Sequence, residues 1–157
     1  MKKFFLLVCA LLLTSCCSDK ACRIEGQLSD MPEQEAFARF RELPAQEKVD
    51  VYVWDLSQKR PVASRFEFIL HESPEAVASP LLNAANEAKG YMVQVSILKS
   101  LSRLPPTSRE KLDPARVEAA IKRCHSLAKS ESDELCRRYG QELLGEASLG
   151  GSEHRAY

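Results

Sequence analysis

The sequence predicts an all-α protein, built as a compact antiparallel bundle of helices or as a short helical solenoid. Two observations lead to this class. Apolar residues recur three and four positions apart through most of residues 30–145, which is the period of an amphipathic helix. Strand-like alternation is limited to residues 49–70, and an isolated hairpin is only marginally stable in water.

The first helix is expected to begin near Asp30. Asp30 and Glu33 have the spacing of a capping box, in which two side chains satisfy backbone N–H groups at a helix start. Behind them Phe37, Phe40 and Leu43 recur every third residue and would share one face. We therefore expect a helix whose apolar side packs into a core.

Residues 49–70 allow two interpretations. Apolar and polar residues alternate over 49–56 and again over 62–70, which is typical of a β-hairpin. The same residues also fit two amphipathic helices, because their apolar positions are separated by three, four and seven residues. Since the rest of the chain offers no further strands, we expect helices here and keep an α+β fold with one hairpin at 49–70 as the alternative.

The later helices have clear start and stop signals. Ser73-Pro74 and Asp113-Pro114 each place a capping residue before a proline, which suits the first helical turn. An apolar stripe that ends at Leu104 is followed by Pro105-Pro106, which cannot continue a helix, and we expect residues 105–112 to form a polar connection. The last helix is expected to end before Gly145.

The leader predicts export of the chain. Lys2 and Lys3 precede an apolar run over residues 4–13, and small polar residues then lead to a cysteine, as in a bacterial signal peptide. The run is too short to span a bilayer as a helix, which needs about 20 residues. Residues 1–15 are therefore expected to be removed.

The four residues Leu13-Thr14-Ser15-Cys16 resemble the lipobox of bacterial lipoproteins. The resemblance implies that Cys16 is lipidated and becomes the first residue of a mature, membrane-anchored protein. Several acyl chains together hold a protein stably, since each buried methylene contributes about 0.8 kcal/mol. In lipoprotein sorting of the enterobacterial type, an aspartate after the lipidated cysteine favours the inner membrane. Cys17 stands there instead, so the resemblance implies the periplasmic face of the outer membrane rather than the inner membrane.

The leader and the helical pattern divide the chain into four parts. Residues 1–15 are the signal peptide, and residues 16–29 are expected to be a flexible tether because small and polar residues dominate them. Residues 30–145 form one helical domain. Residues 146–157 are expected to be a disordered tail.

The cysteines are expected to form disulfides in an oxidising compartment. Cys124 and Cys136 flank a polar stretch between two expected helices, so an antiparallel helix pair would bring them face to face. Whether Cys17 and Cys22 pair is left open.

A zinc site at Cys124, His125 and Cys136 is the alternative to that disulfide. It is not favoured, because neighbouring Cys and His side chains diverge on a helix and no fourth ligand is evident. We therefore expect neither a metal nor another cofactor.

The charge pattern excludes an electrostatic nucleic-acid binder. The chain has 22 basic and 22 acidic residues, and Lys2 and Lys3 would leave with the leader. The remaining charges are interspersed without a polybasic run, so neither nucleic acid nor anionic lipid headgroups would be attracted. The membrane contact is then expected to be the lipid on Cys16 alone.

No residue pattern names a reaction, and we expect a protein that is not an enzyme. Glu67 and His71 lie four residues apart, a pair that can bind metal or move protons. No third ligand or nucleophile accompanies them, which favours a solvated surface pair. Tyr52 and Trp54 are candidates for contact with a partner, although core positions are the more common place for such residues.

One segment resembles a known class of domain. Phe40-Arg41-Glu42-Leu43, Val49-Asp50-Val51-Tyr52 and Pro80-Leu81-Leu82 give the segment from 37 to 104 a resemblance to small HEAT-like helical domains of uncharacterised bacterial proteins. The resemblance implies a scaffold that binds partners and carries no catalytic residues.

Three functions follow as hypotheses. The favoured one is a membrane-anchored, non-enzymatic module that binds another protein, either as an accessory of an envelope complex or as an immunity-type protein. The second is a carrier of a small apolar ligand, held between helices at Phe37, Phe40, Phe66 and Leu98. The third is a hydrolase that uses Glu67 and His71.

Overall fold

Every regular element that the structure describes is an α-helix, so the predicted all-α class is confirmed. The structure is a computed structural model that describes residues 19–58, 64–128 and 133–145. Within these ranges no strand occurs. The signal peptide, Cys16, Cys17 and the expected tail lie outside the described residues. The helices are α2 (Lys20–Ser29), α3 (Glu33–Glu42), α4 (Ala45–Ser57), α5 (Glu67–Leu70), α6 (Pro74–Glu87), α7 (Tyr91–Ser102), α8 (Pro106–Arg109), α9 (Pro114–Leu127) and α10 (Asp133–Leu144).

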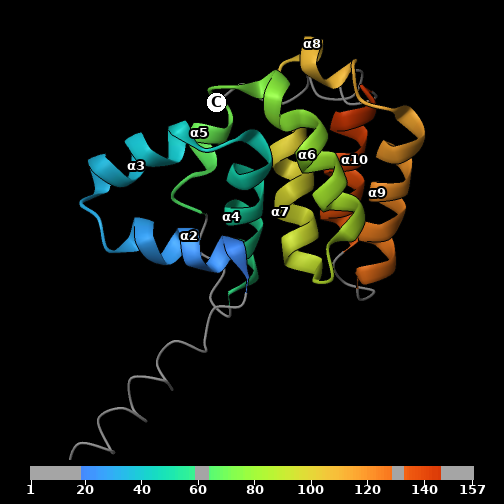
Figure 1. Cartoon of the computed structure of the whole chain (residues 1–157). Helices are drawn as coiled ribbons and strands as arrows, with labels where there is room; N and C mark the ends of the chain where they lie inside the picture. The colour runs from blue at the N-terminus through green and yellow to red at the C-terminus, as the bar shows by residue number, and fades with distance from the viewer. Residues whose placement is uncertain (1–18, 59–63, 129–132, 146–157) are drawn as a thin grey trace, which may run out of the picture.

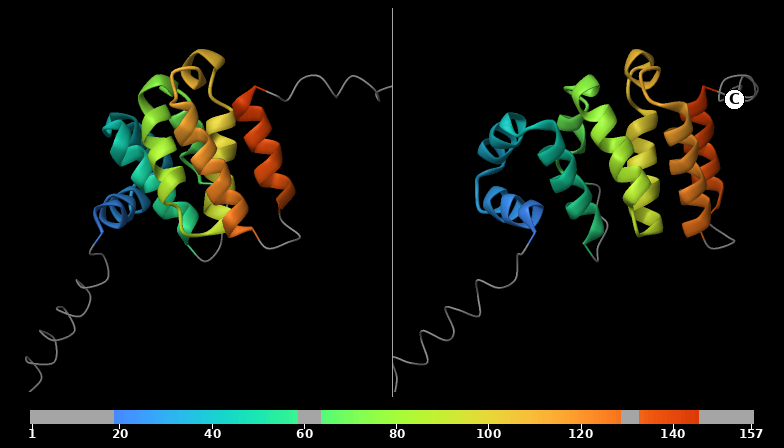
Figure 2. Two further views of the ribbon diagram at one scale, coloured as in Figure 1. Left: turned by 90° about the vertical axis from the view of Figure 1, so that its right-hand side faces the viewer. Right: turned by 45° about the vertical axis from the view of Figure 1, so that its right-hand side comes forward.

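The longer helices pack in two rows, with α4, α6 and α9 in one row and α7 and α10 in the other, and helices of one row run in the same direction (Figures 1 and 2). Helices α4, α6, α7, α9 and α10 stand roughly parallel to one axis, with α6 between α4 and α9, and α7 packed on α10 (Figures 1 and 2). Helices α2 and α3 lie on the outer side of α4, and the short helices α5 and α8 join longer ones. The consecutive pairs α6/α7 and α9/α10 are antiparallel, and the whole is a compact helical bundle, as the sequence predicts.

One continuous core holds the helices together. Each long helix contributes one apolar face, and the largest side chains buried there are Tyr52, Phe40, Phe66, Leu28, Ile69, Leu70, Leu81, Ile97, Leu98, Leu101 and Leu104. Burying one such side chain stabilises the fold by about 1.5–3 kcal/mol. Phe40 of α3 stacks on Phe66 at a centroid distance of 4.3 Å, which fixes the outer helices to the segment that leads into α5.

The flexible tether predicted for residues 16–29 is wrong over residues 20–29, which form helix α2. The Asp19 side chain accepts a hydrogen bond of 3.0 Å from the Ala21 N–H and caps the helix. Ala21 and Leu28 are buried, and α2 packs against α4. The sequence pattern hid this helix because only a few of its residues are apolar, so that its stability comes from tertiary packing.

The proposed capping box at Asp30 is also wrong. Helix α3 begins at Glu33 behind Pro32, and Asp30 instead ends α2 as its C-cap. The Pro32 backbone is extended, with ψ at 144°, so Asp30 lies outside the first turn of α3 and its carboxylate caps no N–H there. By contrast, Asp113 caps α9 as predicted, accepting from the Ala115 N–H at 3.0 Å with Pro114 in the first turn.

The helical interpretation of residues 49–56 is correct, because they lie inside α4 and form no hairpin strand. For 62–70 the prediction was too long, because within the described part, residues 64–70, only Glu67–Leu70 is helical. The connection expected at 105–112 contains the short helix α8, whose first residue is Pro106. Pro80 lies inside α6, which continues through it.

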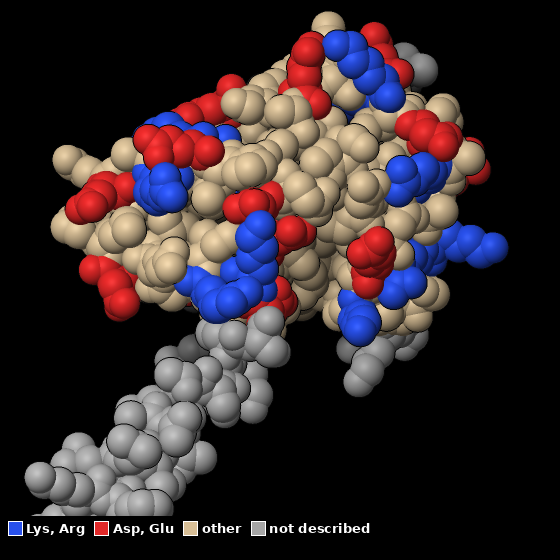
Figure 3. Space-filling view, in the orientation of Figure 1, with Lys and Arg blue, Asp and Glu red and all other residues tan. Residues whose placement is uncertain are grey.

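The surface carries mixed charge. Lys and Arg side chains alternate with Asp and Glu over the face seen in Figure 3, and no extended patch of one sign stands out there. Among the described helices, none combines the length and the apolar character that crossing a bilayer would require.

Candidate functional site

Helices α9 and α10 are joined by the disulfide that the sequence predicts. Cys124 and Cys136 are bonded, with their Cα atoms 5.7 Å apart, and neither side chain is exposed. A disulfide of this kind persists in an oxidising compartment and is rare in the cytosol. The chain therefore has a feature that fits an exported protein.

The disulfide also removes the zinc ligands that were considered. Donor atoms of His125, Asp133 and Cys136 lie within 4.8 Å of one another, and Asp133 is a possible ligand that the sequence did not reveal. However, the Cys136 sulfur is bonded to Cys124, so it offers no thiolate. His125 instead contacts the Asp133 carboxylate through Nδ1, which makes the pair an ion pair when the imidazole is protonated.

Glu67 and His71 belong to a larger polar network between α4, α5 and α7. The Glu67 carboxylate accepts from Arg103 at 3.0 Å. His71 Nε2 lies 3.2 Å from the Ser100 hydroxyl, and both Ser100 and Arg103 lie on or directly after α7. Sequence reasoning found the first two residues and missed the other two, because Ser100 and Arg103 are about thirty residues further along the chain.

The pKa of His71 is lowered and the pKa of Tyr52 is raised at this place in the fold. Burial is the main reason for the low His71 pKa, and Arg103 adds to the effect while Glu67 opposes it. Burial is also the main reason for the high Tyr52 pKa, reinforced by the negative charge of Glu67. His71 is therefore biased towards its neutral form, which can accept or donate one proton.

A serine beside a neutral histidine and a carboxylate is the residue set of a hydrolase, but access is lacking here. Ser100 has no exposed surface, so a substrate could reach its hydroxyl only if the side chains that cover it moved aside. Buried polar groups that satisfy one another are common in cores. In this arrangement the network fixes α5 against α7.

The surface feature best suited to contact is a groove of about 750 Å³, called the α4–α6 groove below. It is bounded by α4 and the second half of α6, with the starts of α2 and α7 at its ends. The apolar residues Val53, Trp54, Ala84 and Val93 line it, and each remains partly exposed. The residues lining the groove are Asp19, Ala21, Gln46, Asp50, Val53, Trp54, Ser57, Asn83, Ala84, Glu87, Ala88, Lys89, Gly90 and Val93.

The two aromatic residues predicted to contact a partner have different environments in the structure. Trp54 lines the α4–α6 groove and is partly exposed, so it stays a candidate contact. Tyr52 is not: it is fully buried, and its hydroxyl donates to the Ser96 carbonyl at 3.2 Å. Residues two positions apart on a helix point in different directions, which is why only one of the pair can face the groove.

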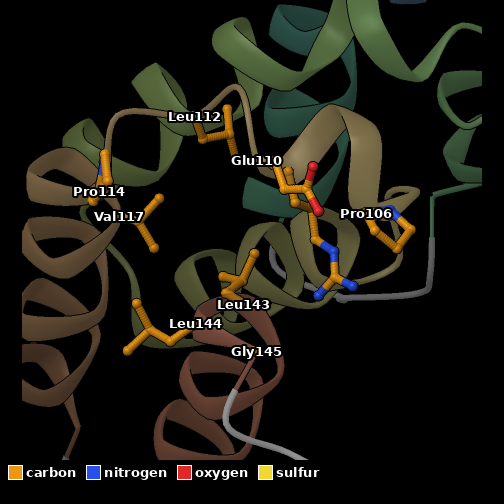
Figure 4. Close-up of a pocket in the computed structure, with 9 residues that line it drawn as sticks. Pro106, Glu110, Leu112, Pro114, Val117, Leu143, Leu144 and Gly145 are labelled. Atoms are coloured by element: carbon orange, nitrogen blue, oxygen red, sulfur yellow. The ribbon is translucent and has the colours of Figure 1, made fainter.

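A second, smaller pocket of about 440 Å³ lies at the opposite end of the bundle, beside α8 and between α9 and α10. Figure 4 shows Leu112, Val117, Leu143 and Leu144 around it, and Glu110 also lines it. This is not the ligand cavity that the sequence suggested.

The expected cavity site is filled. Phe40, Phe66 and Leu98 are fully buried, and Phe37 packs edge-on against Phe66 at 6.1 Å. These side chains belong to the packed core, so any small apolar ligand would have to bind elsewhere.

Comparison with known proteins adds no relative from which a role could be transferred. No family model matches the chain, and no curated protein or solved structure matches it either.

Proposed function

We propose that the chain is a membrane-anchored lipoprotein that faces the periplasm and binds another protein without catalysing a reaction. Its lipid would be attached at Cys16, and the outer membrane is favoured over the inner membrane because Cys17 follows. The partner would be a component of an envelope complex or a toxin that an immunity-type protein neutralises. No nucleic acid and no cofactor enter the proposal.

The observation that carries the binding role is the partly exposed Trp54 in the α4–α6 groove. Tryptophan is enriched among the residues that dominate binding energy in protein interfaces, because it buries a large rigid surface. Apolar residues and polar residues line the groove together, as they do in protein–protein interfaces.

The distance from the anchor supports a role at the membrane surface. Asp19 lines the groove, and only Cys17 and Ser18 separate it from Cys16. Three residues of extended chain span at most about 11 Å. A lipid on Cys16 would therefore hold this end of the bundle close to the bilayer, whereas a free tether of fourteen residues would have allowed many orientations.

Site-specific photocrosslinking in cells tests the proposal. Ser57 is exposed and lines the groove, so a photoreactive amino acid there should crosslink to a defined envelope protein. The matched control is Glu118, which is exposed on α9 and does not line the groove. Crosslinking from position 57 but not from position 118 supports the proposal. Failure of membrane-anchored protein to crosslink at position 57 would contradict it.

The apolar pocket of Figure 4 favours a second function, the transport or storage of a small apolar ligand. Its volume lies within the range of about 300–1,000 Å³ that is typical of small-molecule sites. Intact-mass spectrometry under gentle ionisation should then detect a bound lipid, and Val117→Trp should displace it by filling the pocket. Protein without bound lipid that also gains no thermal stability from fatty acids would remove this alternative.

A further inference from the structure

We infer that the α4–α6 groove accepts a positively charged segment with an apolar anchor residue, supplied by a neighbouring protein at the point where that protein leaves the membrane. The inference rests on the proposed function, since it names the kind of partner that the groove fits.

Acidic residues outnumber basic ones among the described residues that line the groove. Asp19, Asp50 and Glu87 line it, and Lys89 is the single basic residue among the described lining residues. None of the three carboxylates forms an ion pair with a described Lys, Arg or His, although such pairs occur at eight other places on this part of the chain. Asp50 accepts a hydrogen bond from the Gln46 amide at 2.8 Å and Asp19 accepts one from the Ala21 N–H, so within the described ranges these carboxylates have neutral partners and no counter-ion.

Three basic side chains near the groove bind groups other than these carboxylates, and one of them, Arg116, donates to the Asn83 side chain in the groove wall at 2.6 Å. Lys20 pairs with Glu47 at 2.8 Å, on the side of α4 where α2 begins. Arg123 donates to the Ala88 carbonyl at 2.6 Å, so it serves the end of α6 rather than the Glu87 carboxylate. Since Glu87 lies in the last turn of α6, the negative end of that helix adds to its charge. A bound lysine or arginine would relieve this local excess.

The shape of the groove adds an apolar requirement. Trp54 of α4 and residues of α6 line the groove together. An apolar side chain of a partner that inserts between them would be shielded from water. Charges at the rim select the partner and speed its approach, whereas the buried anchor supplies most of the affinity. A short segment that alternates basic and apolar residues satisfies both conditions.

The position of the groove restricts the origin of that segment. Because about 11 Å of chain at most separates Asp19 from the proposed lipid on Cys16, a segment bound in the groove would lie near the bilayer. The residues of a neighbouring envelope protein that directly follow its own membrane anchor meet this condition.

Trp54 provides the test, because it is the only tryptophan in the chain. Full-length lipidated protein in phosphatidylcholine nanodiscs is titrated with two end-blocked probe peptides, Lys-Leu-Lys-Leu-Lys and Glu-Leu-Glu-Leu-Glu, while Trp54 emission is recorded. We expect a saturable change with the basic peptide and an affinity at least about ten-fold weaker for the acidic one. Calorimetry on the same samples separates binding in the groove from adsorption to empty nanodiscs.

Variants that remove charges of opposite sign from the groove should change the affinity for the basic peptide in opposite directions. Asp50→Asn combined with Glu87→Gln should weaken binding of the basic peptide about three- to ten-fold, which is the range expected for two solvent-exposed ion pairs. Lys89→Gln should strengthen it, which a merely damaged groove would not do. Glu118→Gln, outside the groove, should leave the affinity unchanged.

Each contrary outcome has a separate meaning. Equal binding of both peptides, or binding of neither, overturns the basic-segment inference but leaves the proposed function to the crosslink at Ser57. A crosslinked partner whose contacting segment is acidic overturns the inference in the same way. If the basic peptide binds as expected but no protein crosslinks at Ser57 in cells, the charge preference stands and the proposed partner-binding role fails.

Discussion

Removing the bond between Cys124 and Cys136 should destabilise the bundle by a predictable amount. The two cysteines are 12 residues apart, so the bond closes a short loop of the unfolded chain. In the chain-entropy description such a loop corresponds to about 3 kcal/mol of stability at 25 °C. Both sulfurs are fully buried between α9 and α10, so an alanine pair would also leave part of that contact unfilled.

Urea unfolding with and without a phosphine reductant isolates the contribution of this bond. With an m-value of about 2 kcal/mol per M, reduction should lower the urea midpoint by about 1.5 M more in the wild-type protein than in a variant without this bond, because the disulfide at Cys22 is reduced in both. The double variant Cys124→Ala/Cys136→Ala is the control, because any other effect of the reductant occurs in both proteins. The reasoning is refuted if reduction shifts both midpoints equally, since the bond would then contribute nothing to stability.

Three smaller predictions concern the core and the polar network. Tyr52→Phe loses the hydrogen bond to an α7 carbonyl and should cost about 1 kcal/mol in urea unfolding; an unchanged midpoint would show that the bond contributes nothing. An alanine at position 140 would place its Cβ 3.0 Å from the Ile121 side chain, whereas a Cβ at Gly26 would meet no atom within 4 Å. Gly140→Ala should therefore be about 1–3 kcal/mol less stable than Gly26→Ala. Equal urea midpoints for the two variants would refute the close packing at Gly140. The pKa of His71 lies below 6.5 in the folded state, so the unfolded chain binds the proton first and the stability should fall as the pH drops below about 6.5. His71→Gln should make that fall less steep between pH 7.5 and 5.5. An equally steep fall in the variant would contradict the assignment.

The sequence predicted the long helices because their signals are local. The 3.6-residue period, the Asp113 cap and the prolines beside helix starts all act within one or two turns. The bond between Cys124 and Cys136 was predictable for a related reason, since two helices joined by a short connection have to pack antiparallel.

Helix α2 was missed because its stability is not local. Its sequence includes Gly26 and few apolar residues. It is helical because Ala21 and Leu28 are buried where α2 packs against α4. The prediction for residues 62–70 was too long, because, of the described residues 64–70, only the four residues of α5 are helical.

The candidate site was only partly predictable. Trp54 was identified as a possible contact from its residue type, but the groove around it is built from four helices whose relative positions no local pattern defines. The same limit applies to the network at His71, whose partner Ser100 lies 29 residues away.

Mass spectrometry of the protein purified from its native membrane tests the central claim, the lipid at residue 16, most directly. The account predicts a chain that begins at Cys16, carries acyl groups on that residue and is recovered with the envelope fraction. A Cys16→Ala variant should remain unprocessed and unacylated. Recovery of wild-type protein as an unacylated chain that starts at Met1 in the soluble fraction would contradict the anchor, and with it the placement of the groove beside a membrane.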